Sequence, residues 1–407
     1  MSRIIFVNHC YAPSTQATAQ LLGDLAEGLV AQGRSVLVVT ARSEPTAAPH
    51  ETRTGVTVIR LVPAAPVAPA WARIGGWRRF HRATEAWLNQ NLLPGDIVVT
   101  MSDPPLLAPA VSRACRRHGV RLIHWIQDIY PELLDAAGVG AIAQPLVALL
   151  RPARDRAWRG ADACVTLGRT MAALVARRGV SPERIHISAN WSPAATEAPS
   201  PESVAAIRYE WGVGDHLTAV YSGNLGRVHD LAPCLDVAAH VGPAAGVRFV
   251  FVGHGAQRRP LEEMATRRGL SHVSFHDPQP RARLPAALAA ADVHWVTLRP
   301  GCEDLVYPSK LYGIAAAGRP VIAIAPCGSE LAAEISTHKL GVCRDRGDTA
   351  ALATQLQQWR DDPSTLRELA QNASRYDAAN GGSLRALREW TQLLSQLEPM
   401  NALPRPV

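Results

Sequence analysis

The chain has 407 residues, which is enough for two domains that each bury a core of their own. With 47% hydrophobic and 19% charged residues it has the composition of a folded globular protein, which excludes an intrinsically disordered chain. Its net charge of +7 favours acidic partners, a class that includes nucleotide diphosphates, anionic lipids and nucleic acids.

The cysteines and the N-terminus indicate a cytoplasmic protein. Seven cysteines are scattered without CxxC spacing, and Met1-Ser2-Arg3 runs directly into an apolar strand instead of a signal peptide. We therefore expect reduced thiols in a cytoplasmic setting. No apolar run reaches the ~18 residues that a membrane-spanning helix needs, so we expect none.

The first half of the chain alternates between strand and helix patterns. An apolar strand at 4–7, a helix from about 15 to 31 and a strand at 35–40 predict a βαβ unit with parallel pairing. Further strands are predicted at 56–61, 96–101, 121–126, 161–167 and 185–188. Ligands gather at the carboxyl ends of such strands, so the loop after the first strand is a candidate wall of a site. It carries Tyr11, Ser14 and Thr15.

A second polar loop, at 127–132, follows the strand predicted at 121–126. It contains Asp128, Tyr130 and Glu132. Two carboxylates in one loop suit acid–base chemistry or the binding of sugar hydroxyls. The alternative is structural, with Asp128 capping a helix and Glu132 exposed on the surface.

The helix predicted from about Trp71 to Leu88 mixes aromatic and basic residues. Trp71, Trp77 and Arg78 give it the composition of a segment that contacts a membrane surface. The alternative is a helix packed on its domain with a solvated basic face.

The second half repeats the strand–helix rhythm after a segment rich in Pro and Ser at 192–203, which we interpret as a linker. Its strands are predicted at 217–222, 247–252, 273–275, 293–298 and 321–325. We predict an α/β fold with two Rossmann-like, doubly wound parallel-sheet domains facing a cleft, at 1–195 and 204–380. The last segment, 381–407, contains a helix that we expect to return to the N-terminal domain.

The stretch 298–330 has the features of an anion site. Ser309 and Lys310 open one predicted helix, and a loop containing Gly328, Ser329 and Glu330 leads into another. Helix N-termini present unpaired N–H groups that suit a phosphate, and Lys310 adds a full charge. Glu303, in the loop before the first helix, is suited to accept hydrogen bonds from hydroxyls.

Two glycine turns in the second half complete the predicted donor site. The amides of Gly223 and Asn224 are placed to approach a diphosphate that Arg227 neutralises. The turn that contains Gly253 and His254 is predicted to lie beside a nucleotide base. There is no GxGxxG after the first strand, which disfavours an NAD enzyme, and no DxD at a strand end, so we expect no metal.

Taken together, these residues resemble the retaining family-4 glycosyltransferases, which have the two-domain GT-B plan. The resemblance is strongest to the bacterial surface-polysaccharide branch that includes N-acetyl-fucosamine transferases of O-antigen synthesis. It covers nearly the whole chain and is carried by four motifs, at Tyr11–Leu22, Gln127–Glu132, Ser222–Gly226 and Glu303–Pro320.

The resemblance implies roles for individual residues. Gly223, Asn224 and Arg227 would bind the donor diphosphate, and Glu303 would contact the hydroxyls of the donor sugar. Gly313 stands near the place of the family's second glutamate, so Glu330 is inferred to hold the ribose instead. Arg227 and Lys310 would then supply the positive charge.

The resemblance also implies partners. The donor would be a nucleotide sugar and the acceptor a saccharide linked to polyprenyl diphosphate, with no metal or other cofactor. Asp128 would position a sugar and would not act as a nucleophile. The protein would be peripheral on the anionic inner face of the cytoplasmic membrane.

Three other functions remain as alternatives. A nucleotide-sugar 2-epimerase shares the two-domain plan but needs no acceptor. A polyanion-binding protein is suggested only by the positive charge, because basic residues are not interleaved with aromatic residues outside 71–82. For the same reason we expect no nucleic-acid partner. An NAD oxidoreductase lacks its fingerprint.

Overall fold

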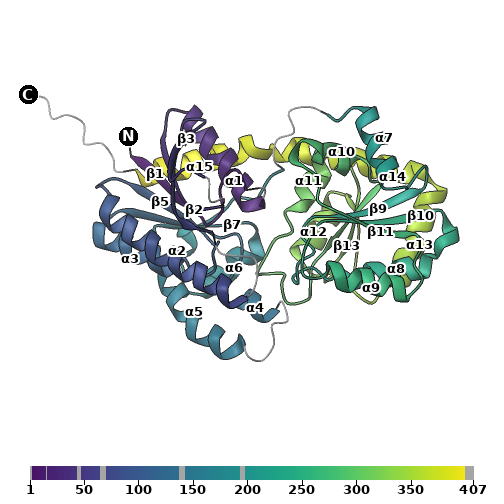
Figure 1. Ribbon diagram of the computed structural model, residues 1–407, viewed down its shortest axis with the longest axis horizontal. Coiled ribbons are helices and arrows are strands. Elements are labelled where there is room, and N and C mark those ends of the chain that lie inside the picture. The colour runs from purple at the N-terminus through teal and green to yellow at the C-terminus, as the bar shows by residue number, and fades with distance from the viewer. Residues whose placement is uncertain are drawn as a thin grey trace, which may run out of the picture. The chain divides into compact units, whose positions relative to one another are not determined.

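The computed structural model describes residues 2–14, 16–43, 47–64, 70–136, 143–192 and 198–398 (Figure 1). The chain forms two compact units. The N-terminal unit contains Met1–Asp135, Val139–Asn190 and Ser383–Val407, and the C-terminal unit contains Ala136–Gly138 and Trp191–Gly382. Among the described residues, no helix is long and apolar enough to cross a membrane.

The N-terminal unit is built on an eight-stranded sheet in the order β3-β4-β2-β1-β5-β6-β7-β8. The central strands consist mostly of buried β-branched and aromatic residues, as strands covered on both faces do. The strands are β1 (Arg3–Val7), β2 (Ser35–Arg42), β3 (His50–Arg53), β4 (Val56–Pro63), β5 (Ile97–Met101), β6 (Arg121–Trp125), β7 (Ala163–Thr166) and β8 (Ile185–Ile187). Every pair is parallel except β3 with β4, so the sheet is mixed.

Helices cover both faces of this sheet. Figure 1 shows α2, α3 and α5 together on one face, where Phe80, Leu88 and Val111 pack against the strands. The helices of this unit are α1 (Ala17–Ala31), α2 (Ala70–Asn91), α3 (Ala108–His118), α4 (Glu132–Ala136), α5 (Ala143–Arg159), α6 (Arg169–Arg177) and the 3-10 turn η1 (Pro182–Arg184). The sequence patterns predicted neither β3 nor α5. β3 is a short polar edge strand, and α5 contains Pro152 in its interior.

The C-terminal unit is an all-parallel six-stranded sheet in the order β11-β10-β9-β12-β13-β14. Its strands are β9 (Leu217–Ser222), β10 (Val247–Val252), β11 (Val273–His276), β12 (Val293–Thr297), β13 (Val321–Ile324) and β14 (Gly341–Arg344). Its helices and 3-10 turns are α7 (Pro201–Glu210), α8 (Ala232–Val241), η2 (Pro243–Ala245), α9 (Arg258–Arg267), η3 (Arg281–Arg283), α10 (Leu284–Ala289), α11 (Lys310–Ala316), α12 (Glu330–Thr337), α13 (Thr349–Asp361) and α14 (Pro363–Asn380). The predicted linker is therefore shorter than expected, since α7 begins at Pro201. Residues 193–197 of that linker lie outside the described residues.

The last helix, α15 (Gly382–Leu397), belongs to the N-terminal unit, as expected. Its Trp390 is buried, with ring centroids 4.9 Å from Trp125 and 6.4 Å from Phe6. Ser188 donates a 2.7 Å hydrogen bond to the Glu389 carboxylate on the same helix. Together with the mostly parallel N-terminal sheet and the all-parallel C-terminal sheet, this helix confirms the predicted α/β architecture.

We predict that Trp390→Ala destabilises the N-terminal unit by about 3–5 kcal/mol, because the substitution leaves a cavity between two other large aromatic rings. Denaturant unfolding followed by circular dichroism measures the effect. Leu384→Ala on the same helix is the control, since that side chain is 66% exposed and its loss is expected to cost less than about 0.5 kcal/mol. Equal effects of the two substitutions would contradict the packing role of Trp390.

Candidate active site

In the C-terminal unit, the glycine turns that follow β9 and β10 are joined by backbone hydrogen bonds. Gly223 N–H donates to the Val252 carbonyl at 2.9 Å, and Leu225 N–H donates to the His254 carbonyl at 2.8 Å. Gly253 has φ +146°, and a Cβ there would collide with the Gly223 carbonyl oxygen. The second turn therefore requires glycine, and its main role in the structure is to hold the first turn in place.

This arrangement corrects the prediction that the amide of Gly223 approaches a diphosphate. The amides of Gly223 and Leu225 are used by the neighbouring turn. Within the described residues, the amides of Asn224 and Gly226 make no recorded hydrogen bond and remain for a ligand. The His254 side chain is 70% exposed, and its predicted contact with a base remains a prediction.

We call the turn after β9, residues 223–227, the Gly223 turn. Lys310, the first residue of α11, lies next to it. Its Nζ is 3.7 Å from the centroid of the Tyr221 ring and would be 3.5 Å from a Cβ at Gly223. This Nζ is buried and has no hydrogen-bond partner among the described residues. Burial lowers the pKa of Lys310 to about 7. Burying an ammonium without an acidic partner is unfavourable, and an anionic ligand bound beside it would compensate its charge.

His229 flanks the same cluster without adding charge. Its ring contacts Tyr221 edge-on with centroids 5.9 Å apart, and its Nδ1 donates to the Thr297 carbonyl at 2.9 Å. Burial, and then the charge of Lys310, lower the pKa of His229 to about 3. His229 is therefore neutral near pH 7, and the positive charge of this cluster is that of Lys310.

Arg227 differs from Lys310 in its surroundings. It is exposed on the Gly223 turn and forms no ion pair with any residue that the structure describes. The structure thus shows one buried cation, Lys310, and one solvated cation, Arg227, and their joint contact with a diphosphate remains a prediction.

The other predicted donor-site residues lie in the loops before α11 and α12. Ser329 is buried, and its hydroxyl accepts from Ala332 N–H at 3.2 Å, so it caps α12. Ser309 precedes α11 without a side-chain capping bond, and Gly328 is exposed. Glu303 and Glu330 are half-buried, and their roles in binding hydroxyls remain predictions.

In the N-terminal unit, Asp128 lies at the carboxyl end of the sheet. The Ser102 hydroxyl accepts hydrogen bonds from the amides of Gln127 and Asp128, both at 3.0 Å. Burial, reinforced by the charge of Asp103, raises the pKa of Asp128 to about 7. The residue borders a cavity of about 30 Å³ together with His124 and Tyr130, which is space for roughly one water molecule. Asp128 can therefore act as a hydrogen-bond donor or acceptor near neutral pH.

Glu132 is not the free partner of Asp128 that the loop sequence suggested, nor is it fully exposed. It forms ion pairs with Arg154 at 2.7 Å, Arg151 at 3.0 Å and Arg178 at 3.3 Å. Although burial acts to raise it, the hydrogen bonds and charge of Arg154 hold the pKa of Glu132 below its ordinary value. Arg154 also donates to the Tyr130 carbonyl at 2.6 Å. Glu132 therefore anchors the 127–132 loop as a permanent carboxylate.

The loop after β1 was predicted to be a wall of the site. Tyr11 is only 2% exposed, so its side chain packs in the core, and its contact with an acceptor remains a prediction. Ser14 is half-buried, and its N–H donates to the Tyr11 carbonyl at 3.0 Å within the loop. Thr15 lies outside the described residues.

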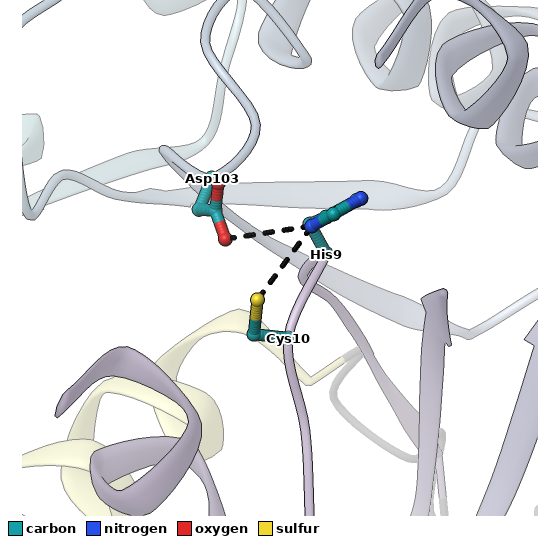
Figure 2. A group of neighbouring side chains, drawn as sticks. All are labelled: His9, Cys10 and Asp103. Carbon is teal, nitrogen blue, oxygen red and sulfur yellow. Dashed lines mark hydrogen bonds and ion pairs between the residues drawn. The ribbon is translucent and has the colours of Figure 1, made fainter. Parts of the chain in front are cut away.

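Among the described residues, one group offers a possible set of metal ligands, namely His9, Cys10 and Asp103 (Figure 2). His9 Nδ1 lies 3.6 Å from Cys10 Sγ and 4.0 Å from Asp103 Oδ2. The first distance suits a tetrahedral zinc site, whereas the second exceeds the ~3.4 Å that ordinary bond lengths give. Burial raises the pKa of the Cys10 thiol, which favours the protonated form that binds metal poorly. The arrangement is that of a hydrogen-bonded cluster.

The predicted membrane helix corresponds to α2. Ile74 is 51% exposed and Arg73, Arg78 and Arg79 are exposed, while Trp77 is half-buried with the Arg73 guanidinium 5.3 Å from its ring. The side chain of Trp71 lies outside the described residues. We call Arg73, Ile74, Trp77, Arg78 and Arg79 the α2 patch.

Comparisons with known proteins agree with this architecture. Residues 17–191 match the family described as "Glycosyl transferase 4-like domain", and residues 206–376 match "Glycosyl transferases group 1". The glycosyl transferase WcaI of Escherichia coli (strain K12), whose name assigns it to colanic acid biosynthesis, is 26% identical over 86% of this chain and 89% of its own. WbjE of Pseudomonas aeruginosa, named a glycosyltransferase, is 28% identical over 64% of each chain.

A solved structure shows the same fold. Alr3699/HepE of Anabaena, in complex with UDP and glucose, has a TM-score of 0.73 over 97% of this chain and 100% of its own. At 16% sequence identity this likeness establishes the fold alone.

We predict that Glu132→Ala lowers the free energy of unfolding of the N-terminal unit by about 2–3 kcal/mol, because it removes one of the two carboxylates that pair with the nearly buried Arg154 guanidinium, the other being that of Asp155. Denaturant unfolding gives the value. In the matched control, Glu263→Ala, an exposed ion pair with Arg259 is removed, and the loss should stay below about 1 kcal/mol. A Glu132 variant as stable as the Glu263 variant would show that the arginine cluster is not a structural support.

Proposed function

The chain is a glycosyltransferase whose two halves belong to the glycosyl transferase 4-like and group 1 families, and we propose that it acts on a lipid-linked acceptor. In this proposal it moves a sugar from a nucleotide diphosphate to a saccharide on polyprenyl diphosphate. The observation that carries it is the Lys310 ammonium, buried beneath the Gly223 turn without an acidic partner. An anion with at least one oxygen close to Gly223 would supply that partner.

The proposed mechanism relies on charge stabilisation. Breaking the bond between sugar and phosphate places negative charge on the leaving diphosphate, and fixed donors lower the energy of that state more than the energy of bound substrate. Lys310 and the amides of Asn224 and Gly226 are the donors, and exposed Arg227 adds charge once the ligand is bound. We propose a retaining reaction without a metal ion and without a protein nucleophile.

The sugar and ribose contacts are also proposals. Glu303 binds hydroxyls of the donor sugar, and Glu330 binds the ribose. Asp128 positions a sugar hydroxyl, a task that suits a carboxyl whose pKa lies about 7 because it can donate or accept.

We also propose a pathway, the biosynthesis of a bacterial surface polysaccharide such as an O-antigen. The name of WcaI, which assigns that protein to colanic acid biosynthesis, supports a role in polysaccharide biosynthesis. We propose an N-acetylhexosamine such as N-acetyl-fucosamine as the transferred sugar. The α2 patch supports peripheral binding to the cytoplasmic face of the inner membrane, where a polyprenyl-linked acceptor would be presented.

We predict that Lys310→Met lowers the transfer rate by on the order of 10²-fold and abolishes the pH dependence of UDP binding. UDP is the probe because it occupies the similar Anabaena structure. The ammonium of Lys310 is present below its pKa of about 7 and lost above it, and a bound diphosphate raises that pKa. Wild-type affinity should therefore fall roughly tenfold between pH 7 and pH 8.5. Calorimetry and an assay with UDP-sugars and lipid-linked saccharide measure the two effects.

Lys339→Met is the matched control, since Lys339 precedes β14 in a surface turn away from the glycine turns. Near-normal turnover by Lys310→Met would overturn the diphosphate assignment. A UDP-sugar incubated without acceptor separates the two reactions, because only an epimerase would then release an epimer.

A second prediction concerns the α2 patch. Replacing Trp77 and Arg78 together by Ser should weaken binding to vesicles that contain anionic phospholipid by about tenfold, because Arg78 loses its attraction to the headgroups and Trp77 its interfacial contact. Vesicle sedimentation measures binding. Arg259→Ser, which removes an exposed positive charge from the C-terminal unit, is the control. Unchanged binding by the double variant would exclude the α2 patch as the membrane contact.

A further inference from the structure

We propose that Tyr221 is a positioning residue of the donor site, which holds Lys310 with its ring and the Gly223 turn with its hydroxyl. This inference rests on the proposed function, because it concerns how the site is prepared for a diphosphate. Tyr221 is the penultimate residue of β9, so the sheet fixes it two residues before Gly223, where the glycine turn begins.

The ring of Tyr221 supports the ammonium. Lys310 Nζ lies 3.7 Å from the ring centroid and has no hydrogen-bond partner among the described residues. The negative face of an aromatic ring attracts a cation, and the attraction increases when both groups are removed from water. The Tyr221 side chain is fully buried, so this contact fixes the ammonium next to Gly223 before any ligand arrives.

The hydroxyl of Tyr221 supports the turn. It donates to the Asn224 carbonyl at 2.8 Å. The amide on the other side of the same peptide group, Leu225 N–H, donates to the His254 carbonyl at 2.8 Å. Both ends of the peptide between Asn224 and Leu225 are therefore held, which sets the direction of the neighbouring Asn224 and Gly226 amides.

Tyr221 is suited to this role and not to proton transfer. Burial raises its pKa far above the ordinary value, so the hydroxyl remains a hydrogen-bond donor. Its ring is packed between Phe251, at a centroid distance of 6.3 Å, and His229, at 5.9 Å. The Tyr221 side chain thus contacts both the Lys310 ammonium and the Gly223 turn, the two parts of the site that we propose bind the diphosphate.

The two functions of Tyr221 can be separated by substitution. Tyr221→Phe keeps the ring and removes the hydroxyl, so we expect UDP affinity to fall about threefold to tenfold with an unchanged pH profile. Tyr221→Leu removes the ring as well. We expect a fall of roughly thirtyfold, and a pH profile shifted to lower pH because the ammonium loses its support. Calorimetry with UDP gives both quantities, and circular dichroism checks that each variant is folded.

A double-mutant cycle with Lys310→Met tests whether the ring acts through the lysine. In the Lys310→Met background, the further change Tyr221→Leu should cost no more than Tyr221→Phe does, because the ammonium is already absent. Fully additive effects, or a Tyr221→Leu variant with wild-type affinity and pH profile, would overturn the proposal. If Tyr221→Leu does not fold, Tyr221→Phe decides alone, and wild-type affinity in that variant would overturn the role of the hydroxyl.

The outcome also distinguishes this inference from the proposed function. If the wild-type protein binds neither UDP nor another nucleoside diphosphate, the proposed function fails. If it binds UDP and Lys310→Met loses that binding while both Tyr221 variants keep it, the donor site stands and the positioning role of Tyr221 is wrong.

Discussion

The donor site of the C-terminal unit depends on one buried ammonium, that of Lys310, which has no hydrogen-bond partner among the described residues. Placing a charge away from water is unfavourable unless another group compensates for it, and proteins normally provide a carboxylate. Here Lys310 has the face of an aromatic ring and the edge of a glycine turn instead. The lysine is also at the carboxyl end of a parallel sheet, where the loops are free to surround a ligand. The protein thus retains an unfavourable charge at the place where an anion can relieve it.

At the carboxyl end of its own sheet, the N-terminal unit carries partly buried carboxylates where the C-terminal unit carries a buried ammonium. Glu132 is surrounded by three arginines and is fixed as a carboxylate. Asp128, four residues earlier in the same loop, forms no ion pair with any residue that the structure describes, and the charge of Asp103 lies near it. One acid is therefore part of the scaffold, while the other is free to change protonation with its contacts. The two carboxyl groups lie in one loop, but their different surroundings shift their pKa values in opposite directions.

Much of the fold could be predicted from the sequence, because the rhythm of apolar strands and amphipathic helices is a local signal. The strands from β9 to β13 and the return of α15 are examples. Two of the missed elements, β3 and α5, have weak local signals, because β3 is polar and exposed and Pro152 interrupts the pattern of α5. Lys310 could be singled out as a candidate from the sequence because it opens a helix after a loop. The ion pairs of Glu132 could not be predicted from the sequence, since Arg154 and Arg178 are 22 and 46 residues away from it. Two further features could not be predicted because they arise from tertiary contacts. They are the burial of Tyr11 and the hydrogen bonds between the two glycine turns.

The position of Trp390 has a consequence for how the protein is made. Its ring fills the space beside Phe6 and Trp125, and Arg34 pairs with Glu398 at the end of the described chain. During synthesis the C-terminal unit is complete when Gly382 leaves the ribosome, but the N-terminal unit still lacks its last helix. The half of the protein that is translated first therefore needs the helix that is translated last to complete the packing around Phe6 and Trp125.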